Sequence, residues 1–422
     1  MASATLARPV TMPVTMIVAG DPGQLTGGYL YDARIAEALR ARGCRVEVVG
    51  LEGRFPVPDD LARRSMTRAL AALPDGARVV IDGLAMGGLP EVIARHADRL
   101  AIIALVHHPL ADETGLDEAT RRSLLDSETR ALALARRVIV TSRFTARGLG
   151  RFGVAPERLR VVEPGVEPVP LAASALDLES PGSRRLLCVA TLVPRKGHDV
   201  LLKALAGLGE RDWTLTAIGS AERDSAHAAR LYEATRRYGL EGRIDWAGER
   251  STAELAAAYH RAELFVLPSR YEGYGMVVTE ALSRGLSVLT TTGGALVDTL
   301  PPGAGLAVPP DDADALGAAL AAWLDDAALR CRLRRGAREA RGHLGDWQQA
   351  GDRFLAALED AAAPTPAPTP DPTDAGQAPE HEQAAGRYLR IEIDSRLTRE
   401  NDCAERGGQE SLERRRYAGL GK

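Results

Sequence analysis

Residues 268–282 have the sequence Pro-Ser-Arg-Tyr-Glu-Gly-Tyr-Gly-Met-Val-Val-Thr-Glu-Ala-Leu, and this stretch decides how the rest of the chain is interpreted. The apolar run Leu264–Leu267 before it predicts a strand, and Val277–Leu282 predicts a helix. The carboxylates of Glu272 and Glu280 would then lie in the loop and on the helix of one strand–loop–helix unit. Since the amide groups at a helix N-terminus carry partial positive charge, those around Gly275 favour an anionic ligand such as a phosphate.

The length and composition of the chain predict two soluble α/β domains. A chain of 422 residues is longer than one hydrophobic core usually serves. Hydrophobic residues make up 45% and charged residues 26%, as in ordinary globular proteins. The formal net charge of -4 gives no electrostatic reason to bind nucleic acid, so an anionic ligand must be met by local charges.

Short apolar strands alternate with helix-like stretches along two successive halves of the chain, and this alternation predicts two doubly wound parallel sheets. In the first half the expected strands are Val14–Ala19, Arg45–Val49, Val79–Ile81, Ala101–Val106 and Arg137–Thr141. In the second half they are Arg185–Ala190, Thr214–Ile218, Ile244–Trp246, Leu264–Leu267 and Ser287–Thr290. The proline-containing residues 164–181 show no sustained period and mark a connection between the halves.

A basic loop lies in the same half as residues 268–282. The segment Cys188–Asp199 ends a predicted strand, and Arg195 and Lys196 follow at the start of a helix. Two cations there could grip a diphosphate, because fixed cations stabilise the charge that develops on a leaving phosphate. The alternative to phosphate binding by Arg195 and Lys196 is a solvated basic turn. The alternative to ligand binding by Glu272 and Glu280 is that they cap and solvate the helix and loop.

Together these segments resemble the family 4 glycosyltransferases, which are retaining enzymes of the GT-B architecture, with two Rossmann-like domains facing an interdomain cleft. The resemblance covers most of Met16–Ala361. It rests on four features in order: Pro-Arg-Lys-Gly at residues 194–197, Glu-x7-Glu at Glu272 and Glu280, Gly293-Gly294, and the segment at residues 303–312.

The resemblance implies a nucleotide-sugar donor and assigns roles residue by residue. Lys196 would bind the donor phosphates, Glu280 the ribose and Glu272 the transferred sugar, while Tyr274 and Gly275 would lend backbone amides to the diphosphate. One position departs from the family pattern. The family usually has arginine where Thr191 stands, and Arg195 is the sequence's candidate to compensate.

The first half carries two adjacent histidines after a predicted strand. By resemblance, a histidine lies near the reacting sugar, and its position favours His107, with His108 as the alternate. The pair could also bind a metal, but no carboxylate or cysteine stands at convincing spacing, and GT-B enzymes work without one. We therefore expect no metal and no cofactor. Asp112 and Glu113 follow and could shape an acceptor pocket or lie in a solvated loop.

Gly27 and Gly28 follow the first predicted strand in a loop that resembles the family's glycine-rich loop over donor and acceptor. A tight turn before a helix is the alternative. No Gly-x-Gly-x-x-Gly follows that strand, which disfavours a dinucleotide oxidoreductase.

The resemblance predicts transfer of a sugar from a nucleotide-sugar donor to an acceptor hydroxyl, with retention of anomeric configuration and without a metal. The acceptor would be a sugar, a lipid or a small molecule. Two alternatives stay open: a GT-B sugar-nucleotide 2-epimerase, and a non-catalytic homologue that binds nucleotide-sugars, which the departure at Thr191 makes conceivable.

The expected organisation has five parts. Residues 1–168 would form the N-terminal acceptor domain, 169–183 the connection, 184–344 the donor domain, and 345–362 a helix that by resemblance crosses back to the first domain. Residues 363–422 begin with a proline-rich segment and continue as a charged tail, for which we expect disorder rather than a short strand at Tyr388–Ile393.

The expected location is the cytoplasm. The N-terminus lacks the uninterrupted apolar core of a secretory signal, and the four cysteines lack the spacing of a zinc site. Family members often act on lipid acceptors, which leaves a peripheral position at the inner membrane surface open, although the sequence shows no strongly basic amphipathic helix to support it.

Overall fold

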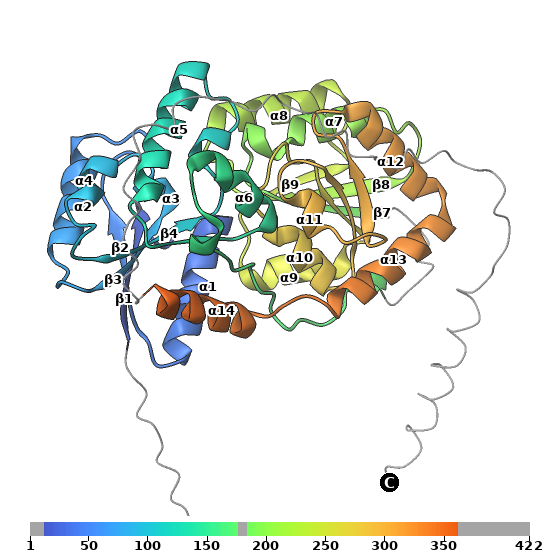
Figure 1. Cartoon of the computed structure of the whole chain (residues 1–422). Coiled ribbons are helices and arrows are strands. Elements are labelled where there is room, and N and C mark those ends of the chain that lie inside the picture. Colours follow the sequence, from blue (N-terminus) through green and yellow to red (C-terminus); the bar gives the residue numbers. More distant parts are fainter. Residues whose placement is uncertain (1–11, 176–183, 362–422) are drawn as a thin grey trace, which may run out of the picture. The chain divides into compact units, whose positions relative to one another are not determined.

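Two six-stranded parallel sheets, flanked by helices, confirm the predicted α/β class (Figure 1). The computed structural model describes residues 12–175 and 184–361. All of them belong to one unit of the chain, which ends at Pro364. The proline-rich segment and the strand considered at Tyr388–Ile393 lie outside the described residues.

The N-terminal sheet has the strand order β2-β1-β3-β4-β5-β6. Its strands are β1 (Pro13–Ala19), β2 (Arg45–Leu51), β3 (Arg78–Asp82), β4 (Ala101–Val106), β5 (Arg137–Val140) and β6 (Leu159–Val161). All neighbouring strands pair in parallel, for example Ile81 of β3 with Ala104 of β4. The order of the first five strands is that of flavodoxin-like sheets.

Both faces of the inner strands β3 and β4 are buried, which explains why these two strands are almost continuously apolar. In β4, Ile102, Ala104 and Val106 enter one hydrophobic cluster, whereas Ile103 and Leu105 enter another. The first cluster is completed by α2 (Asp60–Ala71), α3 (Gly83–Met86), α4 (Pro90–Ala94) and α5 (Glu118–Ala133). The second is completed by α1 (Gly27–Ala41) and by α14 (Trp347–Asp360), which comes from the far end of the described chain.

Shorter helical segments follow the outer strands of this half. They are η1 (Leu110–Asp112), α6 (Arg143–Gly148), η2 (Leu149–Phe152), η3 (Pro156–Arg158) and η4 (Ala173–Ala175). The expected connection at residues 169–183 is described only as far as residue 175.

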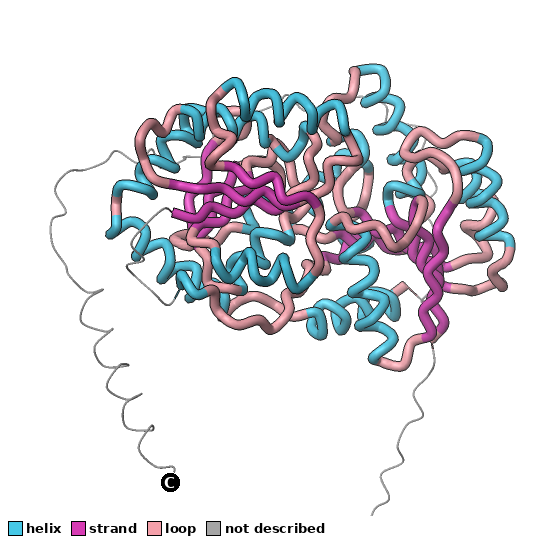
Figure 2. The backbone as a smooth tube through the Cα atoms, turned by 180° about the vertical axis from the view of Figure 1, so that it is seen from behind, coloured by secondary structure: helices cyan, strands magenta, loops and turns pink. Residues whose placement is uncertain are grey.

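The C-terminal sheet has the order β12-β11-β10-β7-β8-β9, which is the classic Rossmann order counted from β7. Its strands are β7 (Arg184–Val189), β8 (Trp213–Ile218), β9 (Ile244–Gly248), β10 (Leu264–Leu267), β11 (Ser287–Thr291) and β12 (Gly305–Val308). Its helices are η5 (Pro194–Lys196), α7 (His198–Ala206), α8 (Ser225–Arg237), α9 (Thr252–Arg261), α10 (Met276–Ser283), α11 (Leu296–Thr299), α12 (Ala313–Asp325) and α13 (Ala327–Arg341). Figure 2 shows helices on both sides of the strands.

Each sheet has a point where the strand order reverses, and ligands of such folds bind at the carboxyl ends of the strands there. In the C-terminal sheet the reversal falls between β7 and β10, which pair through Leu186 and Leu264. The loops that leave these two strands are residues 190–197 and 268–275. In the N-terminal sheet the reversal falls between β1 and β3, next to β4 and the histidines that follow it.

Sequence analysis did not predict β6 and β12, which are only 3 and 4 residues long and lie at sheet edges. Both strands are only partly buried, and without the buried apolar run of β10 they carry little sequence signal. None of the described helices is long and apolar enough to cross a lipid bilayer.

Candidate active site

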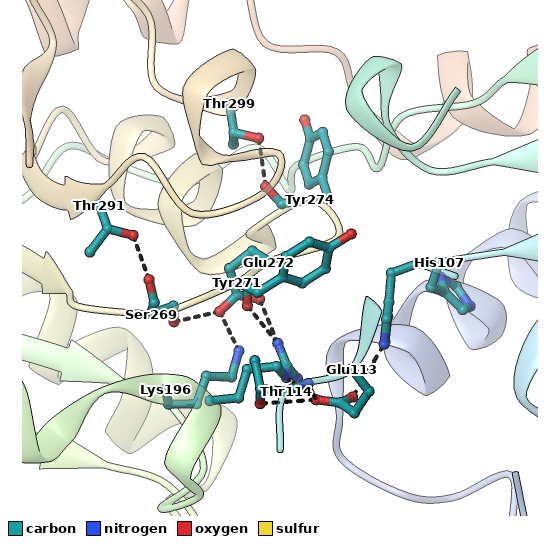
Figure 3. Close-up of polar contacts among 12 residues, drawn as sticks. His107, Glu113, Thr114, Lys196, Ser269, Tyr271, Glu272, Tyr274, Thr291 and Thr299 are labelled. Atoms are coloured by element: carbon teal, nitrogen blue, oxygen red, sulfur yellow. Dashed lines mark hydrogen bonds and ion pairs between the residues drawn. The ribbon is translucent and has the colours of Figure 1, made fainter. Parts of the chain in front are cut away.

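Glu272 is the centre of a buried charge cluster at the reversal point of the C-terminal sheet (Figure 3). Its side chain is only 9% exposed. The Oε1 atom lies 2.5 Å from Lys196 Nζ and accepts a hydrogen bond of 2.6 Å from the hydroxyl of Ser269. The Oε2 atom lies 3.4 Å from Arg195 Nη1. Burial opposes ionisation of Glu272, but the charges of Lys196 and Arg195 lower its pKa to about 2.

Close backbone packing brings these loops together. Gly197 has a φ of +69°, and a β-carbon there would overlap the carbonyl oxygen of Pro268. The amide of Arg270 donates to the carbonyl of Arg195 over 2.8 Å. At Gly294 a β-carbon would overlap the carbonyl oxygen of Glu272. Gly197 therefore allows the contact between the basic loop and the glutamate loop, and Gly294 allows the contact between the glutamate loop and the loop after β11.

Glu280 lies on α10, and a tyrosine side chain hydrogen-bonds to its carboxyl group. Its Oε2 atom accepts a hydrogen bond of 3.0 Å from the hydroxyl of Tyr259. Burial raises the pKa of Glu280, although the Tyr259 hydrogen bond and the charge of Arg284 oppose the shift. Among residues 12–175 and 184–361 Glu280 forms no ion pair, so its carboxyl group is a preformed hydrogen-bonding group.

The start of α10 carries no side-chain cap. Its N-cap residue, Gly275, adopts a left-handed conformation with φ 93°. The preceding carbonyl, that of Tyr274, accepts a hydrogen bond from the Thr299 hydroxyl, which fixes the turn (Figure 3). Amides at such an uncapped helix start can receive an anionic group.

His107 lies near two buried acidic side chains of the N-terminal half, Asp32 and Asp82. Its Nε2 atom is 3.1 Å from Asp32 Oδ1, and the side chain of Asp32 is only 5% exposed. Burial by itself would lower the pKa of His107, but Asp32, with help from Asp82, raises it. Burial disfavours the charged form of Asp82 as well, and for this acid it raises the pKa to about 7.

Gly28 lies directly against His107. A β-carbon at Gly28 would come within 3.2 Å of the His107 ring. Gly27, by contrast, faces open space, since a β-carbon there would meet nothing within 4 Å.

The His108 side chain contacts residues of both halves of the chain. Its Nε2 atom lies 3.3 Å from Glu113 Oε2, and its ring lies edge-on to Tyr271 with centroids 5.9 Å apart. Glu113 also lies 3.4 Å from Arg195, and hydrogen bonding from His108 and the Arg195 charge outweigh its burial, so that its pKa falls to about 2. The two halves also touch at Gly273, where a β-carbon would overlap the carbonyl oxygen of His107.

Thr191 lies apart from this cluster. It lines a cavity of about 280 Å³, whose walls come mainly from the loops after β1 and β8. The loop after β1 contributes Gln24, Leu25 and Thr26, the loop after β8 contributes Ser220, Glu222 and Arg223, and Glu249 completes the lining. Arg195 does not line this cavity, because its guanidinium group reaches Glu272, Glu113 and the carbonyl of Tyr271.

Two family models match successive parts of the chain. The model described as Glycosyltransferase Family 4 matches residues 31–169. The model described as Glycosyl transferases group 1 matches residues 177–340, which contain Lys196, Glu272 and Glu280. The chain is a group 1 glycosyltransferase.

Curated relatives of the transferase carry related names. An MMP alpha-(1→4)-mannosyltransferase of Mycolicibacterium hassiacum is 28% identical over 325 residues, or 73% of this chain and 76% of the relative. A D-inositol 3-phosphate glycosyltransferase of Kineococcus radiotolerans is also 28% identical, over 84% of this chain and 95% of the relative.

Solved structures establish the GT-B fold of the transferase. A sucrose-phosphate synthase from Thermosynechococcus elongatus superposes with a TM-score of 0.70 at 23% identity, covering 83% of this chain and 100% of that one. The Anabaena protein HepE, solved in complex with UDP and glucose, superposes with a TM-score of 0.63 at 17% identity, covering 82% and 99%.

Several side chains around the site of the transferase were not predicted. They are Asp32 and Asp82 near His107, Ser269 at Glu272, and Arg223 in the cavity with Thr191. Asp32 had a detectable signal, because it follows Gly28 by four positions and so lies on the same face of α1. Within residues 12–175 and 184–361, no group of three or more His, Cys, Asp or Glu side chains is arranged to hold a metal ion.

Proposed function

We propose that the transferase moves a sugar from a nucleotide-sugar donor to an acceptor hydroxyl, with retention of configuration and without a metal. The observation that carries this proposal is the fixed arrangement of Lys196 and Ser269 on Glu272 beside the uncapped start of α10. The complex of the structurally similar HepE with UDP-glucose supports the class of donor.

On the donor side, Lys196 and the amides at the start of α10 would hold the diphosphate. Negative charge grows on the leaving phosphate as its bond to the sugar breaks, so a fixed cation and helix amides stabilise the transition state more than the ground state. In the structure Lys196 is paired with Glu272, so a bound phosphate would share or replace that carboxylate as its partner. Glu280 would accept hydrogen bonds from the ribose, and Glu272 from the transferred sugar.

On the acceptor side, His107 would meet the acceptor and the reacting sugar. Asp32 orients its ring through Nε2, which leaves the other ring nitrogen as the polar atom available to a ligand. The contact of Gly273 with the His107 carbonyl supports a site in which the donor loop and the histidine meet.

Retention is proposed to follow a front-face path, in which the departing phosphate takes the acceptor proton. Glu272, the carboxylate nearest the proposed donor, is ion-paired and hydrogen-bonded at Oε1 and faces Arg195 at Oε2. Such a carboxylate is suited to orient hydroxyls rather than to attack carbon. The protein then contributes positioning and charge stabilisation.

The test is a matrix of UDP-, GDP- and ADP-linked sugars against sugar, inositol and phosphorylated acceptors, with release of the nucleoside diphosphate as the readout. We expect one donor to turn over only with an acceptor, and an α-linked donor to give an α-linked product by NMR. Full activity in excess EDTA is expected. A β-linked product would refute retention, and epimerised donor in the absence of an acceptor would favour the epimerase.

A further inference from the structure

The cavity beside Thr191 contains a cation from another loop. Arg223 belongs to the loop between β8 and α8, and it lines the cavity together with Thr191 and Gln24–Thr26. It is exposed to solvent, and its guanidinium group donates a hydrogen bond to the side-chain carbonyl of Gln24.

The backbone holds this loop close to Thr191. The amide of Leu192 donates to the carbonyl of Ser220 over 2.9 Å, and a β-carbon at Gly219 would overlap the carbonyl oxygen of Ala190. The loop after β8 is therefore packed on the end of β7, where the proposed donor site begins. Arg223 of this loop lines the same cavity as Thr191.

Within the described part of the chain, no salt bridge neutralises the charge of Arg223. Among the ion pairs of the described residues, none includes Arg223, and its hydrogen-bond acceptor is the uncharged amide of Gln24. Glu222 and Glu249 line the same cavity without an ion pair to Arg223 within that part of the chain. An arginine held by a neutral group keeps its charge available for a phosphate.

We propose that Arg223 is a donor-binding residue that supplies, from the loop after β8, the cation for the donor diphosphate that Thr191 lacks. This inference rests on the proposed function. On donor binding, the guanidinium group would exchange the Gln24 amide for a phosphate oxygen. The departure at Thr191 would then be a relocation of the charge rather than its loss.

The experiment measures the affinities of UDP, GDP and ADP, and of the three matching nucleosides, by isothermal titration calorimetry. For the nucleotide that binds the wild type best, Arg223→Ala should weaken binding by about 10-fold to 100-fold, as expected for a charged hydrogen bond. The affinity of the matching nucleoside should change less than about twofold, because the nucleoside carries no phosphate. Arg236→Ala, which removes an exposed arginine of α8 outside the cavity, is the matched control.

Two further variants separate charge from loop structure. Gln24→Ala removes the hydrogen bond of Arg223 but keeps the cation, and it should leave nucleotide affinity within about twofold of the wild type. Thr191→Arg in the Arg223→Ala background should recover most of the lost affinity.

The inference is overturned if Arg223→Ala binds the nucleotide as the wild type does, or if Gln24→Ala loses as much affinity. It is also overturned if Thr191→Arg recovers nothing. If the wild type binds none of the three nucleotides, the proposed function itself fails, and the inference fails with it.

Discussion

Lys196 supplies the cation that lies closest to Glu272 in the proposed donor site. Its ammonium group is buried with Glu272, and burial lowers its pKa although the carboxylate favours the charged form. The pair is therefore desolvated, and electrostatic interactions in such a place are stronger than in water.

Replacing Lys196 with alanine should reduce the rate of sugar transfer by about 100-fold or more, because the charge that stabilises the leaving phosphate is lost. The measurement is the initial rate of nucleoside diphosphate release at saturating donor. Lys203→Ala, on the exposed side of α7, is the control and should stay within about twofold of the wild type. A Lys196→Ala enzyme with near-normal rates would contradict the assignment.

Asp32 is buried, and its carboxylate contacts the His107 ring. Its charge and its hydrogen bond counter the effect of burial, so Asp32→Asn should lower the pKa of His107. The measurement is the titration of the His107 ring protons by NMR, assigned with a His107→Gln variant. Asp126→Asn, an exposed change on α5, should leave that titration as it is in the wild type. An unchanged titration in Asp32→Asn would show that the 3.1 Å contact does not govern the ring.

Between the secondary-structure elements, the loops of the site approach one another so closely that only glycine fits at some contact positions. The η5 turn ends at Gly197, which combines a left-handed backbone with contact to the Pro268 carbonyl. Gly209 also has a positive φ, of +61°, but a β-carbon there would meet nothing within 4 Å. A side chain at Gly209 would strain only the backbone conformation, whereas a side chain at Gly197 would also overlap a neighbouring backbone atom.

Gly209→Ala should cost about 1–2 kcal/mol of unfolding free energy, from the left-handed backbone alone. Gly197→Ala should cost more and should also lower the transfer rate, because the loop carrying Arg195 and Lys196 must move away from Pro268. Thermal unfolding followed by circular dichroism, with transfer assays on both variants, provides the comparison. Equal losses of stability for the two variants would argue against the close packing.

In the molecule as a whole, ion pairs join the segments that follow strands of the N-terminal sheet to those that follow strands of the C-terminal sheet. Arg195 follows β7 of the C-terminal sheet, and its partner Glu113 follows β4 of the N-terminal sheet. Arg147 of α6 and Asp298 of α11 form a second link, 2.7 Å long. The helix α14 adds Phe354, Ala357 and Leu358 to the core of the N-terminal sheet, although it follows the C-terminal sheet in the chain.

The Glu113 link predicts a specific dependence of stability on pH. The folded protein lowers the pKa of Glu113 from 4.5 to about 2. The stabilisation by the ionised carboxylate is therefore fully present above about pH 4.5 and is lost as the pH falls toward 2. The Glu113 side chain is 40% exposed, so solvent screening keeps the effect small.

Glu113→Gln should accordingly lower the melting temperature at pH 7, and the difference from the wild type should shrink between pH 4.5 and pH 2. Differential scanning fluorimetry at a series of pH values would measure it. Glu47→Gln, an exposed change on β2, is the matched control. A difference that stays constant down to pH 2 would mean that the ion pair does not stabilise the folded state.

The sequence alone was sufficient for the fold class, most of the strands and the family. The strands of the sheet interiors are apolar runs bounded by loops, and this local pattern is fixed by burial on both faces. The segment with Lys196 and the segment with Glu272 and Glu280 were also singled out from the sequence, because each is continuous and follows a predicted strand.

Only the tertiary structure decided which side chains meet. His107 and Asp32 are 75 positions apart, Lys196 and Glu272 are 76 apart, and Arg223 and Gln24 are 199 apart. No local period or spacing encodes such pairs, since they depend on the strand order of each sheet and on how closely the loops pack. That order placed Arg195 on Glu272 and Glu113, and brought Arg223, which the sequence did not single out, to the cavity beside Thr191.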